Sequence, residues 1–177
     1  MAVVDPFEVL SHYDSVVRQL ARKLPRQVLG VQWVGLELQV GTQSFLAPIL
    51  SVLEIISSPV MTRVPGAQPW LVGVMNIRGS LIPVTDVSYW LTGQPATVVK
   101  SRVLVVERDQ ERYGLQFDRI VGMQRLNEVT MESGSTVQGP LSAFVTQTVV
   151  CAGKKWPVLD LKRLLSQDTF YQTALVS

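Results

Sequence analysis

The sequence predicts a mainly β protein in which two small barrel-like units share a core. Short β-rich runs alternate with Gly, Pro, Asn and Asp along most of the chain, a pattern that favours a barrel or a sandwich. One motif occurs twice, which indicates a duplicated unit. The 177 residues suit two such units packed together, because either unit alone would bury little surface.

At the N-terminus, the sequence predicts an amphipathic helix over residues 5–24. Asp5 suits the N-cap, Pro6 the first helical position, and Glu8 completes an Asp-x-x-Glu capping pattern. Apolar residues follow at helical spacing until Pro25 ends the pattern. Packing on its own domain is the favoured role of this helix, and docking to a partner is the alternative.

After this helix the periodicity becomes that of strands separated by turns. Two hairpins are expected, and a polar stretch rich in Gly and Ser at residues 132–139 is expected to form a loop. The strand-like segments of the hairpins are residues 32–40, 45–49, 102–107 and 113–117.

The duplicated motif is Pro-Val-x-Asp followed by a short helical pattern. It occurs at residues 83–91 and again at 157–165. In both copies a strand ends at Pro-Val, and the Asp that follows is placed to cap the helix. We therefore interpret Asp86 and Asp160 as helix caps and not as catalytic acids.

The repeat also identifies residues that only one copy carries. Residues 45–55 match 113–123 by pattern, so the position equivalent to Glu54 in the second copy is a glycine. Asn76 and Arg78 likewise have no polar equivalents, whereas the glycine that follows Arg78 is kept, as a tight turn requires. Glu54 and Arg78 are expected to pair near a recognition surface. The alternative is an ordinary exposed ion pair, worth about 0–1 kcal/mol.

No pattern in the sequence indicates catalysis, a metal site or a cofactor. The chain has one histidine, His12, and one cysteine, Cys151, which are too few for a His- or Cys-based metal site. Phosphate-binding Gly-rich loops and a Gly-x-Ser-x-Gly elbow are absent from the sequence. We therefore expect no enzymatic activity.

The net charge and the hydropathy of the chain argue against further classes of protein. The net charge is +2 and the basic residues are spread along the chain, which argues against nucleic-acid binding. No apolar run approaches the roughly 20 residues of a membrane helix, and no secretory leader opens the chain. A cytoplasmic protein without membrane insertion is expected. An oligonucleotide-binding barrel is the alternative, and it requires basic and aromatic side chains on one strand face.

Three segments together resemble the CheW-like family of chemotaxis adaptors. Residues 71–86 contain Gly-x-x-Asn-x-Arg-Gly ahead of Pro-Val-x-Asp. Residues 113–123 are similar to the family's second-half strand, and residues 156–161 to its closing strand. These segments occur in the family's order.

The resemblance implies three parts of the chain. Residues 1–27 form an N-terminal helical extension, residues 28–166 the CheW-like domain, and residues 167–177 a C-terminal tail. The domain is expected to contain two five-stranded, SH3-like β-barrels around a shared core, closed by short capping helices.

The function implied is that of a non-catalytic adaptor. Such a protein bridges the cytoplasmic tip of a methyl-accepting chemoreceptor and the regulatory domain of a CheA-type histidine kinase. The long N-terminal extension and the hairpin at 151–154 are more similar to the PilI-type branch, which serves type IV pilus twitching or phototaxis, than to the flagellar branch. Self-association or assembly into arrays stays open.

A set of residues is singled out for receptor or kinase binding. Glu54 and Arg78 match family positions associated with the receptor side, as do Val52 and Ile55, and Arg112 lies in the hairpin of the predicted second barrel. The residues are Val52, Glu54, Ile55, Asn76, Arg78, Gly79 and, in the second hairpin, Arg112.

Overall fold

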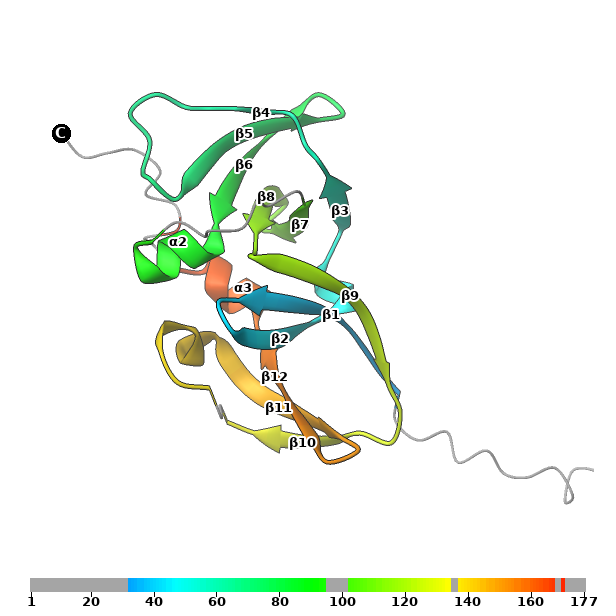
Figure 1. Cartoon of the computed structure of the whole chain (residues 1–177). Helices are drawn as coiled ribbons and strands as arrows, with labels where there is room; N and C mark the ends of the chain where they lie inside the picture. The colour runs from blue at the N-terminus through cyan, green and yellow to red at the C-terminus, as the bar shows by residue number, and fades with distance from the viewer. Residues whose placement is uncertain (1–31, 95–101, 135–136, 168–169, 171–177) are drawn as a thin grey trace, which may run out of the picture. The chain divides into compact units, whose positions relative to one another are not determined.

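The computed structural model describes residues 32–94, 102–134, 137–167 and 170 (Figure 1). The predicted helix at residues 5–24 lies outside these ranges. Within them the chain forms two six-stranded sheets and a few short helices, which confirms the mainly β prediction. Each sheet has one strand more than the expected five, and the shortest strand of each sheet lies at its edge.

We call the two sheets sheet A and sheet B. Sheet A has the strand order β10-β11-β12-β2-β1-β9. Its strands are β1 (Trp33–Val40), β2 (Gln43–Pro48), β9 (Arg119–Leu126), β10 (Thr130–Ser133), β11 (Val145–Cys151) and β12 (Lys154–Leu159).

Sheet B has the strand order β3-β7-β8-β6-β5-β4. Its strands are β3 (Glu54–Ser57), β4 (Met61–Thr62), β5 (Leu71–Ile77), β6 (Ser80–Asp86), β7 (Arg102–Arg108) and β8 (Glu111–Gln116). The helical segments of the described chain are η1 (Ile49–Ser51), α2 (Val87–Thr92), η2 (Pro140–Phe144) and α3 (Leu161–Leu165).

The predicted duplication is present, but the two repeats exchange their first hairpins. The first repeat runs from β1 to α2 and the second from β7 to α3. In sheet A the β1–β2 hairpin lies beside β12, and in sheet B the β7–β8 hairpin lies beside β6 (Figure 1). Each sheet therefore combines strands of both repeats, and the prediction that each repeat forms its own unit is wrong.

The pairing register of the two sheets is equivalent in detail. The exchanged hairpin joins its sheet through a parallel pair in both cases, Val84 with Gly114 in sheet B and Val158 with Leu46 in sheet A. A bulge also interrupts one antiparallel strand pair of each sheet at the equivalent place. It lies between Leu71 and Gly73 in the β5–β6 pair of sheet B, and between Val145 and Gln147 in the β11–β12 pair of sheet A.

A shared core joins the sheets, as predicted. It takes buried side chains from both hairpins and from α2, η2 and α3. Each sheet also has a small core of its own, which is consistent with a sheet curled around its inner face. These small cores consist of Leu46, Leu126, Val149, Trp156 and Val158 in sheet A, and Met75, Ile82, Val84, Val103 and Val105 in sheet B.

Both predicted helix caps are confirmed. The Asp86 carboxylate accepts a hydrogen bond from the Tyr89 N–H at 2.9 Å, and Asp160 accepts one from the Arg163 N–H at 3.0 Å. One buried residue falls in the predicted tail, Phe170, whose side chain is 2% exposed.

An aromatic cluster surrounds Phe170. Its ring centroid lies 5.6 Å from that of Trp90 and 6.3 Å from that of Tyr113, with both pairs edge to face. Trp90 also packs at 5.8 Å on Phe144 of η2. Because these residues come from α2, β8, η2 and the C-terminal segment, the cluster holds both repeats together.

Candidate protein-interaction surface

The turn between β5 and β6 contains three of the predicted binding residues. Arg78 and Gly79 are the two turn residues, with φ values of 51° and 87°. The Gly79 N–H donates a hydrogen bond to the Asn76 side-chain oxygen at 2.9 Å. Asn76 therefore stabilises the turn, and the Arg78 side chain is exposed at its tip.

Arg78 adopts a backbone conformation that favours Gly or Asn. Left-handed φ angles cost a residue with a Cβ about 1–2 kcal/mol. The equivalent turn of sheet A has Ala152 and Gly153, at φ values of 48° and 76°. Since alanine serves the same turn, the guanidinium of Arg78 is not needed for the fold. This supports the hypothesis that Arg78 is kept for recognition.

Three further predicted residues lie at the start of β3. Val52 follows η1 and packs half-buried against the shared core. Glu54 and Ile55 begin the edge strand β3, where they pair with Val105 and Leu104 of β7. Both side chains are exposed, Ile55 by 38%. An exposed apolar residue on an edge strand is accessible to a partner.

The expected ion pair between Glu54 and Arg78 is not formed. Among the described residues, no ion pair joins these two side chains. Glu54 lies on β3, and in the pairing order of sheet B two strands, β7 and β8, separate β3 from the β5–β6 hairpin that carries Arg78. The prediction was based on opposite charge alone. Whether the two side chains meet depends on which strands are neighbours, and the strand order is a property of the tertiary structure.

Arg112 lies in sheet B and not in a separate second barrel. Its Nε is 3.7 Å from the Glu107 carboxylate, directly across the β7–β8 hairpin. Both side chains are exposed, so the pair adds little to stability. Because the hairpins are exchanged, all seven predicted binding residues lie in sheet B or directly before β3.

Sequence reasoning missed several exposed apolar side chains near these residues. Leu81 pairs with Asn76 and is 70% exposed, and Val60, just before β4, is 90% exposed. Leu50 of η1 is 97% exposed. The signal for Leu81 was available in the repeat, because its equivalent across the sheet A hairpin is the charged residue Lys155. The fold therefore accepts a charge where sheet B exposes a leucine.

Two further findings concern metal binding and membrane spans. Within the described ranges, no group of three or more His, Cys, Asp and Glu residues could hold a metal ion. The helices of the same ranges are too short or too polar to cross a bilayer.

Comparison with known proteins shows which family has this sequence and fold. The CheW-like domain family matches residues 34–169. Protein PilI of Pseudomonas aeruginosa is 39% identical over 98% of both chains. The chemotaxis protein CheW of Treponema pallidum is 22% identical over 86% of this chain and 94% of that protein. The crystal structure of scaffolding protein TtCheW from Thermoanaerobacter tengcongensis shares the fold, with a TM-score of 0.66 and 21% identity over 78% of this chain and 96% of that one.

The fold and its surface define a class of protein: a β scaffold whose sheet B exposes apolar and charged side chains that are suited to binding other proteins. The chain belongs to the CheW-like domain family. Members of this family are non-catalytic scaffolds, so the predicted class of a non-catalytic adaptor is confirmed.

Proposed function

We propose that this protein couples a methyl-accepting chemoreceptor to a CheA-type histidine kinase in a type IV pilus signalling system. The observation that carries the pilus assignment is the 39% identity to PilI, which extends over 98% of both chains. The similarity therefore includes the N-terminal extension and is not confined to the CheW-like domain. In this role the adaptor works in the cytoplasm, at the receptor tips.

Sheet B is proposed as the surface that meets a partner. It combines exposed apolar side chains, Leu81 and Val60, with the Arg78 guanidinium at the β5–β6 turn. Arginine is enriched among the residues that dominate binding energy, and neighbouring exposed apolar side chains mark surfaces that bind proteins. The equivalent positions of sheet A carry no such combination, which makes sheet A the internal reference.

The direct test is isothermal titration of the purified full-length protein. The titrants are the regulatory domain of the CheA-type kinase from the same genome and the cytoplasmic tip of its chemoreceptor. We expect dissociation constants on the order of 1–10 µM for single contacts, which avidity would strengthen in an array. Absence of binding to both fragments would contradict the adaptor role and would lead to a gel-shift test with single-stranded DNA.

Two variants and one control locate the surface. Arg78→Ala and Leu81→Lys are expected to weaken binding of at least one partner by about tenfold or more, since the first removes an arginine and the second replaces an apolar contact with a charge. Leu81→Lys inserts the residue that sheet A carries at the equivalent position, so the fold should accept it. The control is Lys155→Ala in sheet A, which should bind as wild type. Unchanged binding in both variants would reject sheet B while keeping the adaptor role.

A further inference from the structure

Neither sheet of this protein is complete within one repeat. Sheet A takes β1 and β2 from the first repeat and its other four strands from the second. Sheet B takes β7 and β8 from the second repeat and its other four strands from the first. A complete pair of sheets therefore requires one first repeat and one second repeat, and this requirement does not specify that both belong to the same chain.

The contacts between the two repeats are extensive. The β1–β9 pairing runs from Trp33 opposite Leu126 to Gln39 opposite Arg119. The β3–β7 pairing, the two parallel pairings and the shared core also join one repeat to the other. A single repeat would leave these strand edges and core side chains without partners, so each repeat needs a complementary repeat to fold against.

A single segment, residues 95–101, connects the two repeats covalently. The first repeat ends with α2, which closes at Gly93 in a left-handed conformation with a φ of 68°. The second repeat begins with β7 at Arg102. The strand pairings between the repeats named above all lie outside residues 95–101. The same pairings therefore form when the two repeats belong to different chains.

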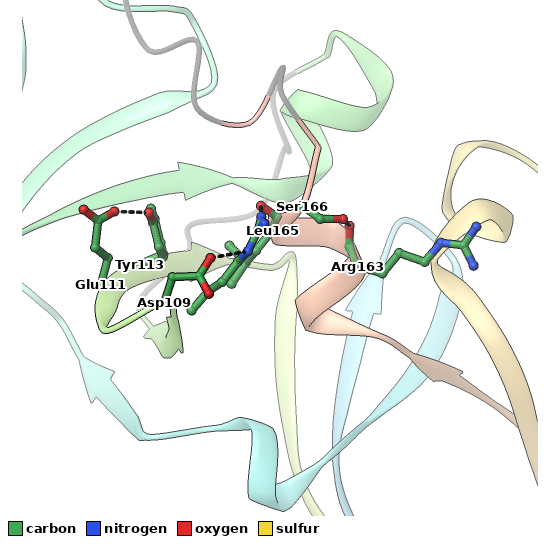
Figure 2. Close-up of polar contacts among 7 residues, drawn as sticks. Asp109, Glu111, Tyr113, Arg163, Leu165 and Ser166 are labelled. Carbon is green, nitrogen blue, oxygen red and sulfur yellow. Dashed lines mark hydrogen bonds and ion pairs between the residues drawn. The ribbon is translucent and has the colours of Figure 1, made fainter.

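The second repeat is held together by a contact of its own, between its hairpin and its helix. The Arg108 guanidinium donates a hydrogen bond to the Leu165 carbonyl at the end of α3, and its Nε lies 3.1 Å from the Asp109 carboxylate (Figure 2). The bond satisfies a carbonyl that the helix end leaves without an internal donor. Because both ends of this contact belong to one repeat, it is kept when the whole repeat pairs with another chain.

The balance between pairing within one chain and pairing between two chains depends on concentration. A dimer that swaps whole repeats keeps every contact of two monomers, because each pair of sheets is the same. Short connections hold two linked modules at an effective concentration in the millimolar range. Pairing within one chain therefore prevails at micromolar concentration, and swapping competes with it as the protein approaches about 1 mM. A shorter connection that cannot span its two ends removes pairing within the chain.

We propose that two copies of this chain swap repeats and form a closed dimer. The first repeat of each copy pairs with the second repeat of the other, and residues 95–101 of each copy connect the two pairs of sheets. The dimer has two sheets B, one in each pair. Since sheet B is the proposed partner surface, the dimer binds two partner molecules at once. This bivalence rests on the proposed function, whereas the swap rests on the strand order alone.

The first test uses damaged chains that only a swap can repair. Leu38→Asp damages the first repeat and Leu159→Asp the second, since both leucines are 0% exposed and a buried charge without a partner prevents folding. Each variant alone should be unfolded. When the two variants are refolded together at about 100 µM, they should regain about half of the wild-type near-UV circular dichroism, because one undamaged pair of repeats forms for every two chains.

The matched control is a mixture of Leu38→Asp with Val84→Asp. Val84 is also 0% exposed and also lies in the first repeat, so this mixture contains no undamaged first repeat and should stay unfolded. No recovery in the mixture of Leu38→Asp and Leu159→Asp would overturn the proposal. Recovery in the control mixture would overturn it too, because the repair would then not depend on an intact first repeat.

The second test leaves both repeats undamaged and measures molar mass by light scattering after size-exclusion chromatography. Wild type should refold as a monomer at about 10 µM and should contain roughly one third dimer or more at about 1 mM. Deletion of residues 97–99 should lower the concentration of half-dimerisation at least tenfold. Monomer alone in both proteins at about 1 mM would overturn the swap. Titration of the wild-type monomer with the kinase fragment tests the adaptor role separately, so either proposal can fail without the other.

Discussion

Sheets A and B share strand order, bulge position and parallel pairing, yet they differ in what they expose and in how their small cores are filled. At equivalent places, sheet A buries Leu46 and Trp156 where sheet B has Gly114 and Ile82. A Cβ added at Gly114 would lie 2.9 Å from the side chains of Val84 and Val103 and 3.1 Å from that of Met75. These three side chains therefore take the space that leucine fills in sheet A. The shared features define the architecture, and the differences define each sheet's own packing and surface.

The first prediction concerns the aromatic cluster that holds the two repeats together. Phe170→Ala is expected to lower the free energy of unfolding by about 3–5 kcal/mol, because it empties a fully buried aromatic site between Trp90 and Tyr113. Urea unfolding followed by tryptophan fluorescence measures the change. Met131→Ala, at an exposed position, is the control and should stay within about 0.5 kcal/mol of wild type. A loss below 1 kcal/mol in Phe170→Ala would mean that the cluster does not hold the repeats together.

The second prediction concerns the bulge that the sheets share. Gly73→Ala is expected to cost about 3 kcal/mol, because the added Cβ would lie 2.4 Å from the Thr62 carbonyl oxygen of β4. Gly122 has the same φ of 154° with open space around it, so Gly122→Ala should cost only about 1 kcal/mol. Thermal denaturation of the two variants separates the clash from the backbone strain. Equal losses would show that β4 is not held against β5 in solution.

The third prediction compares the two helix caps. Asp86 is nearly buried, whereas Asp160 is half-buried. Asp86→Ala should therefore lower stability by about 2 kcal/mol and Asp160→Ala by about 1 kcal/mol, since a buried partner left unsatisfied costs more. Chemical denaturation of both variants checks the order. The reverse order would mean that burial does not determine the strength of the cap.

The smallest expected effect is at the two equivalent turns. Arg78→Asn and Ala152→Asn should each raise stability by about 0.5–1 kcal/mol, because asparagine tolerates the left-handed conformation. Only Arg78→Asn should weaken partner binding in titration calorimetry. If Ala152→Asn weakened binding as much, sheet A would share the recognition surface.

Much of this fold could be predicted from local sequence. The helix caps, the glycine of the β5–β6 turn and the strands around residues 102–117 follow from short-range chemistry, and the structure contains them. The repeat was visible because the Pro-Val-x-Asp motif has the same surroundings in both copies. Local patterns state that a strand exists, and the structure contains strands at the four segments predicted for the hairpins.

The exchange of hairpins could not be predicted in the same way. The pairing of Val84 with Gly114 is parallel and distant in sequence, and no turn signal specifies it. The expected Glu54–Arg78 pair was wrong for the same reason, since it depended on which strands are neighbours. Phe170 was placed in a tail because the resemblance to the family ended at residue 166. Leu81 was missed because one exposed leucine is ordinary until its counterpart, Lys155, is compared with it.

The exchange of hairpins also bears on how the chain folds and how it arose. When the first repeat leaves the ribosome, β6 still lacks the parallel neighbour that the second repeat supplies, so complete folding waits for the rest of the chain. A single ancestral repeat would have had to pair with a second copy and trade hairpins across a two-fold axis. Duplication and fusion of its gene would have made that dimer permanent. Two polypeptides separated within residues 95–101 should therefore reassemble when they are produced together, although neither is a smaller version of the whole.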